Sequence, residues 1–422
     1  MIEIKNETEK VILVGVSLSD QDDTKESLEE LKDLVSTAGA ETVGMVIQNR
    51  EQQHPGTYVG KGKIEELKSM IWELRATGIV CDDELSPAQM KNLQDELDVK
   101  VMDRTLLILD IFAKHATTSE GKIQVELAQL RYRASRLVGL GASLSRLGGG
   151  IGTRGPGEKK LEMDRRLIKS RIAQLNRELK DVKKHREVTR EQRSRSHIPV
   201  AAIVGYTNAG KSTLLNTLTG AGILAEDKLF ATLDPTTRDL KLPSGQEILM
   251  TDTVGFIRKL PHHLIEAFRS TLEEARYADI ILHVVDASNP QMDEQMHTVY
   301  ETLQNLGVKD KPVITVFNKI DRMEDIWVPR DLHADYYVKI SARTGEGITE
   351  FLQAVEAVLR EQKVEIEALY PYKEAGKIQL IRKYGELQEE EYREDGIFVR
   401  AFVPAELYGQ VRPEGVTPNN CL

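Results

Sequence analysis

The sequence contains few cysteines and no long apolar run. Its two cysteines, Cys81 and Cys421, lie far apart and lack the spacing of metal ligands, which argues against a disulfide scaffold and favours a reducing compartment. No apolar run approaches the roughly 18 residues of a membrane-spanning helix. The first residues, MIEIKNETEK, do not have the pattern of a signal peptide. We therefore expect a cytoplasmic protein without a transmembrane segment.

Charge is distributed unevenly along the 422 residues, which suffice for two to four domains. The net charge is −10, but residues 122–195 hold 20 Lys and Arg against 8 Asp and Glu. This segment therefore carries +12 and the rest of the chain −22. An acidic protein with one basic segment is expected to meet a polyanion such as nucleic acid there. The alternative is a solvated helical surface.

Residues 1–112 alternate between short apolar runs and helical patterns, which predicts an α/β domain with a parallel sheet. The predicted strands are VILVGVSL, VGMVIQ, GIVCDD and VKVMD, and the helices lie near 24–37, 63–76, 86–97 and 103–115. Ser86 and Pro87 suit the N-cap and first position of the third helix. The segment GTYVGKGK lacks the spacing of a phosphate loop, so we expect a strand-to-helix connection. An independent ATP site there is the alternative.

Residues 113–197 predict an antiparallel helical hairpin. Apolar residues repeat every three or four positions in two segments, which is the seam of a coiled coil. These residues are Ile123, Leu127, Leu130, Ala134 and Leu137 in the first, and Leu161, Ile168, Ile172, Leu175, Leu179 and Val182 in the second. Residues 141–157 would form the glycine-rich tip, and the polar stretch REQRSRSH would be a linker.

The tip carries cations among its glycines, since six of the ten residues from Gly148 to Gly157 are glycine. Glycine permits close approach of a backbone to RNA, and Lys and Arg side chains contact phosphates. The predicted RNA contacts are Arg146, Arg154, Lys159 and Lys160. We expect the tip to gain order on binding.

Residues 198–364 begin with a nucleotide-binding motif. The apolar run PVAAIVG leads into the pattern G-x-x-x-x-G-K-S and then an apolar helix, which is the strand–loop–helix context of a phosphate loop. Backbone N–H groups would hold phosphates, Lys211 would reach the β- and γ-phosphates, and Ser212 would bind Mg²⁺. The predicted loop residues are Gly205, Tyr206, Thr207, Asn208, Ala209, Gly210, Lys211 and Ser212.

Three later motifs at strand ends select guanine over adenine. In the first, Asp252 would hold the Mg²⁺ shell and the Gly255 N–H would meet the γ-phosphate. In the second, Asp321 would accept hydrogen bonds from guanine N1–H and the 2-amino group, a donor pair that adenine lacks. In the third, backbone N–H groups would contact guanine O6. The predicted residues are Asp252, Thr253, Val254, Gly255, Asn318, Lys319, Ile320, Asp321, Ser341, Ala342 and Arg343.

A switch segment is predicted between these motifs, where a threonine would close over Mg²⁺ and the γ-phosphate. Spacing leaves Thr232, Thr236 and Thr237 open. The segment resembles the F-x-T-L-x-P switch of Obg-like GTPases, and that resemblance selects Thr232 as the second metal ligand. The predicted switch residues are Phe230, Ala231, Thr232, Leu233 and Asp234.

The sequence lacks the glutamine that is expected to assist GTP hydrolysis after the DTVG motif. Phe256 stands where Ras-like proteins have a glutamine that orients the attacking water. Intrinsic hydrolysis is therefore expected to be slow and to need a partner. Arg238, Arg258 and Arg269 lie near the switches, but we interpret them as ordinary surface residues.

The motifs GYTNAGKST, LFATLDPTTR, DTVGFI and NKID, preceded by SRLGGGIGTRGPGEKKLEMDRR, resemble those of the HflX family of ribosome-associated GTPases over essentially the whole chain. We expect a monomeric GTPase that uses GTP and Mg²⁺. The resemblance implies that the N-terminal domain and hairpin bind the large ribosomal subunit, with the tip towards the peptidyl-transferase region, to split or rescue stalled ribosomes under stress.

Residues 365–422 predict a small α/β domain of unassigned role. The predicted fold is therefore a phosphate-loop GTPase domain with a mixed sheet, preceded by an α/β domain with a helical hairpin and followed by an α/β domain. The alternative function is a nucleotide-dependent switch for a protein or RNA partner, in which GTP turnover is incidental.

Overall fold

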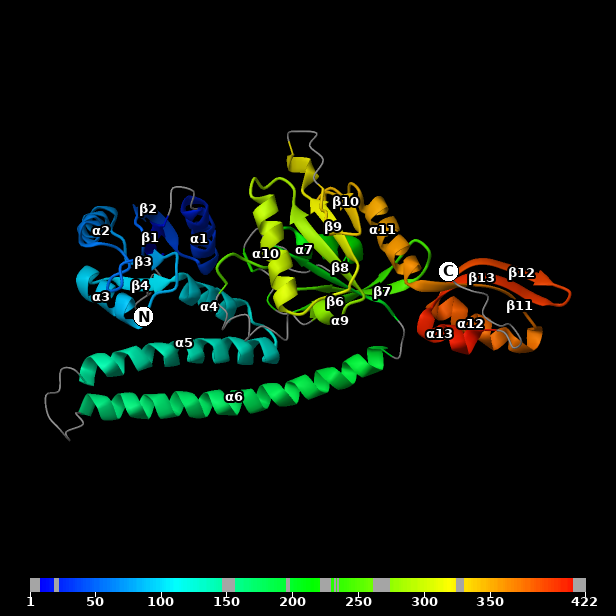
Figure 1. Cartoon of the computed structure of the whole chain (residues 1–422), viewed down its shortest axis with the longest axis horizontal. Coiled ribbons are helices and arrows are strands. Elements are labelled where there is room, and N and C mark those ends of the chain that lie inside the picture. Colours follow the sequence, from blue (N-terminus) through cyan, green and yellow to red (C-terminus); the bar gives the residue numbers. More distant parts are fainter. Residues whose placement is uncertain are drawn as a thin grey trace, which may run out of the picture. The chain divides into compact units, whose positions relative to one another are not determined.

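The computed structural model describes residues 8–18, 23–145, 156–194, 198–220, 229–230, 233, 235–260, 274–323 and 330–412. The chain forms two compact units (Figure 1). The first contains Met1–His185, Glu226–Asp234 and Ile257–Ser270. The second contains Arg186–Ala225, Pro235–Phe256 and Thr271–Leu422. None of the described helices is long and apolar enough to cross a membrane.

The first unit begins with a parallel sheet whose strand order is β2-β1-β3-β4. Strands and helices alternate as predicted, with α1 packed on α4 and α2 packed on α3. Ser86 and Gln89 form a capping box at the start of α3, which confirms the predicted N-cap. The elements are β1 (Lys10–Ser17), α1 (Thr24–Ala38), β2 (Glu41–Asn49), α2 (Lys61–Leu74), β3 (Gly78–Cys81), α3 (Pro87–Leu97), β4 (Lys100–Asp103) and α4 (Arg104–His115).

The glycine-rich segment GTYVGKGK connects β2 to α2. Gly60 is the N-cap residue of α2, and its N–H donates to Gln48 Oε1 at 2.8 Å. Tyr58 is fully buried, and its hydroxyl donates to Asp83 at 2.7 Å. The segment thus has the geometry of the expected strand-to-helix connection.

The hairpin consists of α5 (Ser119–Ser145) and α6 (Pro156–Ser194), which run side by side in Figure 1. The seam residues Leu127 and Leu175 are buried, and Arg171 donates to both carboxylate oxygens of Glu126 at 2.7 and 3.0 Å. The helices extend further than predicted, into both ends of the 141–157 segment. The predicted linker was wrong for residues 190–194, because α6 continues through Arg and Glu residues of high helix propensity to Ser194, and residues 195–197 lie outside the described residues.

The second unit contains a six-stranded mixed sheet of order β10-β9-β8-β5-β7-β6, in which only β6 is antiparallel to its neighbour. Its core includes Ile203, Leu282 and Val316, none of which is exposed. The elements are β5 (Val200–Gly205), α7 (Lys211–Thr219), β6 (Thr236–Lys241), β7 (Glu247–Asp252), α9 (Glu274–Tyr277), β8 (Ile280–Asp286), α10 (Met292–Asn305), β9 (Val313–Asn318), η1 (Ile320–Arg322), β10 (Tyr336–Lys339) and α11 (Ile348–Glu361).

The chain ends in an antiparallel sheet of order β11-β13-β12 whose inner face packs against two helices. The acidic run near residue 390, to which the sequence assigns no element, forms the edge strand β12, where charged residues discourage pairing with another sheet. The elements are β11 (Lys363–Tyr370), η2 (Tyr372–Glu374), α12 (Ala375–Tyr384), β12 (Glu386–Arg393), β13 (Gly396–Pro404) and α13 (Ala405–Val411). The predicted fold class is confirmed.

Candidate functional site

The phosphate loop joins β5 to the N-terminus of α7, so that backbone N–H groups and the helix end face one small volume. Gly210, the N-cap residue of α7, has a φ of 96°, a value that L-residues rarely adopt. The loop is joined to the residue after the DTVG motif: Thr207 N–H donates to the Phe256 carbonyl at 2.8 Å, and Phe256 N–H donates to the Gly205 carbonyl at 3.1 Å.

Lys211 lies buried beneath this loop. Its Nζ donates to the carbonyls of Tyr206 at 2.8 Å and Gly205 at 3.2 Å. Burial lowers the pKa of Lys211 to about 8, and the nearby charge of Lys319 lowers it too, whereas the Asp252 carboxylate opposes the shift. A negatively charged ligand at the loop would favour the ammonium form.

Two oxygen ligands suited to Mg²⁺ meet at the end of β7. The Ser212 hydroxyl donates to Asp252 Oδ2 at 2.8 Å, and Asp252 is fully buried. Hard oxygen donors of this kind are those that Mg²⁺ prefers. The adjacent Gly255 lies so close to the loop that a Cβ there would come within 2.8 Å of Thr207 Cα and 2.9 Å of Lys211 Nζ.

The predicted base-recognition residues come together around Asn318. Its Nδ2 donates to the Ala209 carbonyl at 2.9 Å, and its Oδ1 accepts the Ala342 N–H at 2.9 Å. The Ser341 hydroxyl donates to Asp321 Oδ1 at 2.6 Å, and this bond lowers the pKa of Asp321. Asn318 therefore ties the phosphate loop to the loop that follows β10, and Asp321 is held as a carboxylate.

One residue at this site escaped the sequence analysis. Asp286, at the end of β8, accepts a hydrogen bond from Lys319 Nζ at 2.7 Å. Lys319 has a φ of 65°, and its ion pair fixes it beside Asn318. The sequence did contain a signal for Asp286, which ends the apolar run IILHVVD. Neighbouring parallel strands end at the same edge of a sheet, so an acidic residue at that point is expected near the nucleotide site.

The predicted switch is only partly described. Ala231, Thr232 and Asp234 lie outside the described residues, as do the predicted RNA contacts Arg146 and Arg154. Phe230 belongs to the first unit, where its ring meets that of Phe112 edge-to-face with centroids 4.7 Å apart. The choice of Thr232 therefore stays a prediction.

The structure describes Phe256 and two of the three arginines near the switches. The Phe256 side chain is only 2% exposed. Arg238 donates to the Thr237 carbonyl at 3.2 Å, and Arg258 pairs with Asp23 at 2.7 Å within the first unit. Arg269 lies outside the described residues. Phe256 thus has no polar atom with which to orient a water.

Comparison with known proteins decides the family. Three family models match: "GTP-binding GTPase N-terminal" over residues 25–113, "GTP-binding GTPase Middle Region" over 115–193 and "50S ribosome-binding GTPase" over 200–319. The chain is 71% identical over 411 residues to GTPase HflX of Lacrimispora saccharolytica, covering 97% of each chain. The chain belongs to the HflX family of GTPases. Its predicted resemblance to that family is confirmed.

Other HflX proteins are also similar. GTPase HflX of Escherichia coli is 45% identical over 351 residues, covering 82% of each chain. Among solved structures, a GTP-binding protein from Sulfolobus solfataricus in complex with GDP is 26% identical and has a TM-score of 0.45, covering 83% of this chain and 99% of that one. As a member of the HflX family, this chain is a GTP-binding GTPase.

The low pKa of Lys211 predicts that GDP binding weakens about tenfold from pH 7 to pH 9. Phosphates favour the ammonium form, and the free protein loses that proton as the pH rises through about 8. Titration with a fluorescent GDP analogue measures the change, and calorimetry at pH 8 should show uptake of about half a proton.

The control for this pH dependence is Lys211→Arg, whose guanidinium stays charged and should give a flat profile. A flat profile for the unchanged chain, without proton uptake, would contradict the assignment of Lys211 as the titrating phosphate ligand.

Proposed function

We propose that the site binds GTP with Mg²⁺ and that each motif has a distinct role. Lys211 and the loop N–H groups would hold the β- and γ-phosphates, and Ser212 with Thr232 would bind Mg²⁺, with Asp252 holding its shell. Asp321 would recognise guanine. The pairing of Ser212 with Asp252 at 2.8 Å is the main support for the metal site. Because the Ala342 N–H donates to Asn318 Oδ1 and the Ser341 N–H to the Glu346 carbonyl, recognition of guanine O6 would fall to the Arg343 N–H.

We further propose that the N-terminal region docks on the large ribosomal subunit to split or rescue stalled ribosomes under stress. The observation that carries this proposal is the basic hairpin. Arg165, Arg166 and Lys169 are exposed on α6, the helix that leads away from the predicted contacts Lys159 and Lys160. Exposed cations along a helix favour contact with RNA phosphates. The match to a family model described as a 50S ribosome-binding GTPase agrees with this partner.

Phe256 has no polar atom to orient a water, which favours slow intrinsic turnover that the ribosome would accelerate. The same observation supports the second candidate, a switch whose turnover is incidental. GTP hydrolysis measured with and without large subunits separates the two. Stimulation supports the first function, and unchanged turnover favours the switch.

Charge removal at the hairpin tests the partner. Replacing Arg146, Arg154, Lys159 and Lys160 by alanine is expected to weaken co-sedimentation with large subunits about tenfold and to flatten its dependence on salt, because phosphate contacts are lost. GTP binding should be unchanged. Sedimentation should be measured in GTP-analogue, GDP and nucleotide-free states.

The matched control removes four exposed cations outside the hairpin: Lys241, Arg276, Lys373 and Lys383. This variant should sediment like the unchanged chain. Equal sedimentation of the hairpin variant and the unchanged chain at all salt concentrations would overturn the docking proposal.

A further inference from the structure

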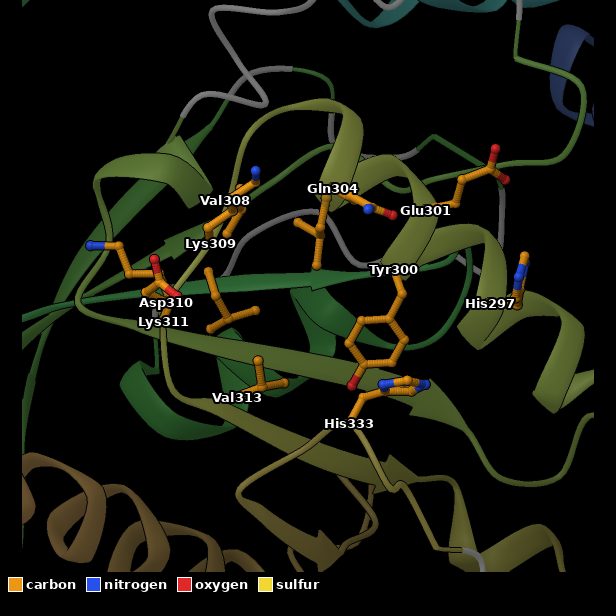
Figure 2. Close-up of a pocket in the computed structure, with 12 residues that line it drawn as sticks. His297, Tyr300, Glu301, Gln304, Val308, Lys309, Asp310, Lys311, Val313 and His333 are labelled. Atoms are coloured by element: carbon orange, nitrogen blue, oxygen red, sulfur yellow. The ribbon is translucent and has the colours of Figure 1, made fainter.

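A cavity of about 400 Å³ lies in the GTPase domain between α10, the turn before β9, and the segment before β10 (Figure 2). This volume is within the range of small-ligand sites. None of its lining residues belongs to the nucleotide site described above. Its lining residues are Ile281, His297, Tyr300, Glu301, Leu303, Gln304, Val308, Lys309, Asp310, Lys311, Val313 and His333.

One wall of the cavity is aromatic and held in place. The rings of Tyr300 and His333 lie next to each other in Figure 2, with centroids 5.2 Å apart. The Tyr300 hydroxyl donates to Asp331 Oδ2 at 2.5 Å, and the backbone N–H of His333 donates to Asp331 Oδ1 at 2.9 Å. Thr315 also donates to Asp331, at 2.6 Å. One buried carboxylate thus holds the Tyr300 hydroxyl and the backbone of His333.

Asp331 keeps its charge despite its burial. Burial alone would raise its pKa, but hydrogen bonds from Thr315, Tyr300 and His333 lower it below the usual value. Behind Tyr300 lies His283, whose ring meets the tyrosine edge-to-face at 4.9 Å. Burial lowers the pKa of His283 to about 4, so the imidazole behind the wall is neutral at pH 7. The Tyr300 part of the wall is therefore held by Asp331 and His283, whereas the His333 ring is exposed beside it.

The opposite side of the cavity carries cations on a tight turn. Figure 2 shows Lys309, Asp310 and Lys311 across from the two rings, with Val313 between the two sides. Asp310 has a φ of 55°, which closes the turn. Two ammonium groups and one carboxylate leave this turn with a single net positive charge. Glu301, which also lines the cavity, offsets this charge, so the two lysines suit one phosphate group better than a triphosphate chain.

We propose that this cavity is a second nucleotide site that binds a nucleoside monophosphate group. The base would lie against Tyr300 and His333, since stacking on aromatic rings contributes about 1–3 kcal/mol per base. The phosphate would meet Lys309 and Lys311. Gln304 offers a donor and an acceptor to the edge of the base. Two sources share this chemistry: a free mononucleotide and an unpaired nucleotide of an RNA.

The test titrates adenosine 5′-monophosphate into the full chain loaded with GDP, with saturation-transfer NMR as the readout. Adenine lacks the donor pair that Asp321 would recognise, so the probe should avoid the guanine site. Saturable binding with a Kd of about 1 mM or below is expected. Binding that does not saturate below about 10 mM would overturn the proposal.

Three variants locate the probe. Gln304→Trp places an indole in the cavity from an exposed helix position and should abolish binding. Lys309→Ala with Lys311→Ala should weaken the monophosphate at least about fivefold but leave adenosine unchanged, because only the phosphate contact is lost. Lys241→Ala, an exposed cation elsewhere on the domain, is the matched control. All variants should retain GTP hydrolysis, which reports folding. Equal binding by Gln304→Trp and the unchanged chain would contradict the site.

Binding of a five-residue oligoadenylate distinguishes the two sources of the nucleotide. The same titration of Gln304→Trp measures the oligoadenylate that binds elsewhere on the chain. A gain of about tenfold over the mononucleotide that is lost in Gln304→Trp supports an unpaired RNA nucleotide. No gain, with the mononucleotide still bound, supports a free ligand. Both outcomes support the site, and the absence of binding by either probe contradicts it.

Discussion

Replacing Asp321 by asparagine should change the base preference of the site from guanine to xanthine. The Asp321 carboxylate is predicted to accept two hydrogen bonds, from guanine N1–H and the 2-amino group. Asparagine presents an N–H₂ donor in place of one acceptor oxygen. Xanthine has a carbonyl where guanine has its 2-amino group, so it would pair with that donor.

The expected loss of GDP affinity is at least about 100-fold, because hydrogen bonds to a charged group contribute about 1.5–3 kcal/mol each. Xanthosine diphosphate should bind at least about tenfold more tightly than GDP in this variant. Competition against a fluorescent GDP or xanthosine diphosphate analogue measures both affinities.

Ser341→Ala is the matched control for this exchange. It removes the hydroxyl that holds Asp321 at 2.6 Å but keeps the carboxylate. It should weaken GDP binding about tenfold without admitting xanthine. If Asp321→Asn keeps its preference for guanine, the base is recognised elsewhere and the assignment of Asp321 is wrong.

The parts of the site that the sequence predicts best are those whose chemistry is local. A phosphate loop needs a strand, a glycine-rich turn and a helix N-terminus in immediate succession, so GYTNAGKST specifies its own geometry. The structure brings that loop together with Asp252 and Asn318 because all three follow parallel strands that end at one edge of the sheet. The convergence of these motifs can therefore be predicted without knowledge of the strand order.

The features that escaped prediction depend on contacts distant in sequence. The ion pair between Lys319 and Asp286 joins the ends of β9 and β8. The acidic strand β12 pairs with β13, and its buried Glu386 forms ion pairs with Arg360 and Lys363 of neighbouring segments. The tight turn at Lys309–Lys311 lines a cavity only because α10 and His333 lie around it. A pattern within one segment contains no information on such partners.

Replacing Gly210 by alanine should both destabilise the GTPase domain and lower GDP affinity about 100-fold. Gly210 has a φ of 96°, and a Cβ there would lie 2.2 Å from Asn318 Nδ2. Asn318 would have to move, which would break its bonds to Ala209 and Ala342. The expected destabilisation is about 2–4 kcal/mol, from backbone strain and steric overlap together.

Gly220 provides the matched control, because it has a φ of 64° but open space around a Cβ. Gly220→Ala should cost only the backbone strain of about 1 kcal/mol and leave GDP affinity unchanged. Thermal unfolding midpoints and titration with a fluorescent GDP analogue compare the two variants. Equal affinity in both would show that Asn318 does not link the phosphate loop to the base-recognition loops. Both positions have a positive φ, so a loss of GDP affinity in Gly210→Ala alone reports the contact between Gly210 and Asn318 rather than backbone strain.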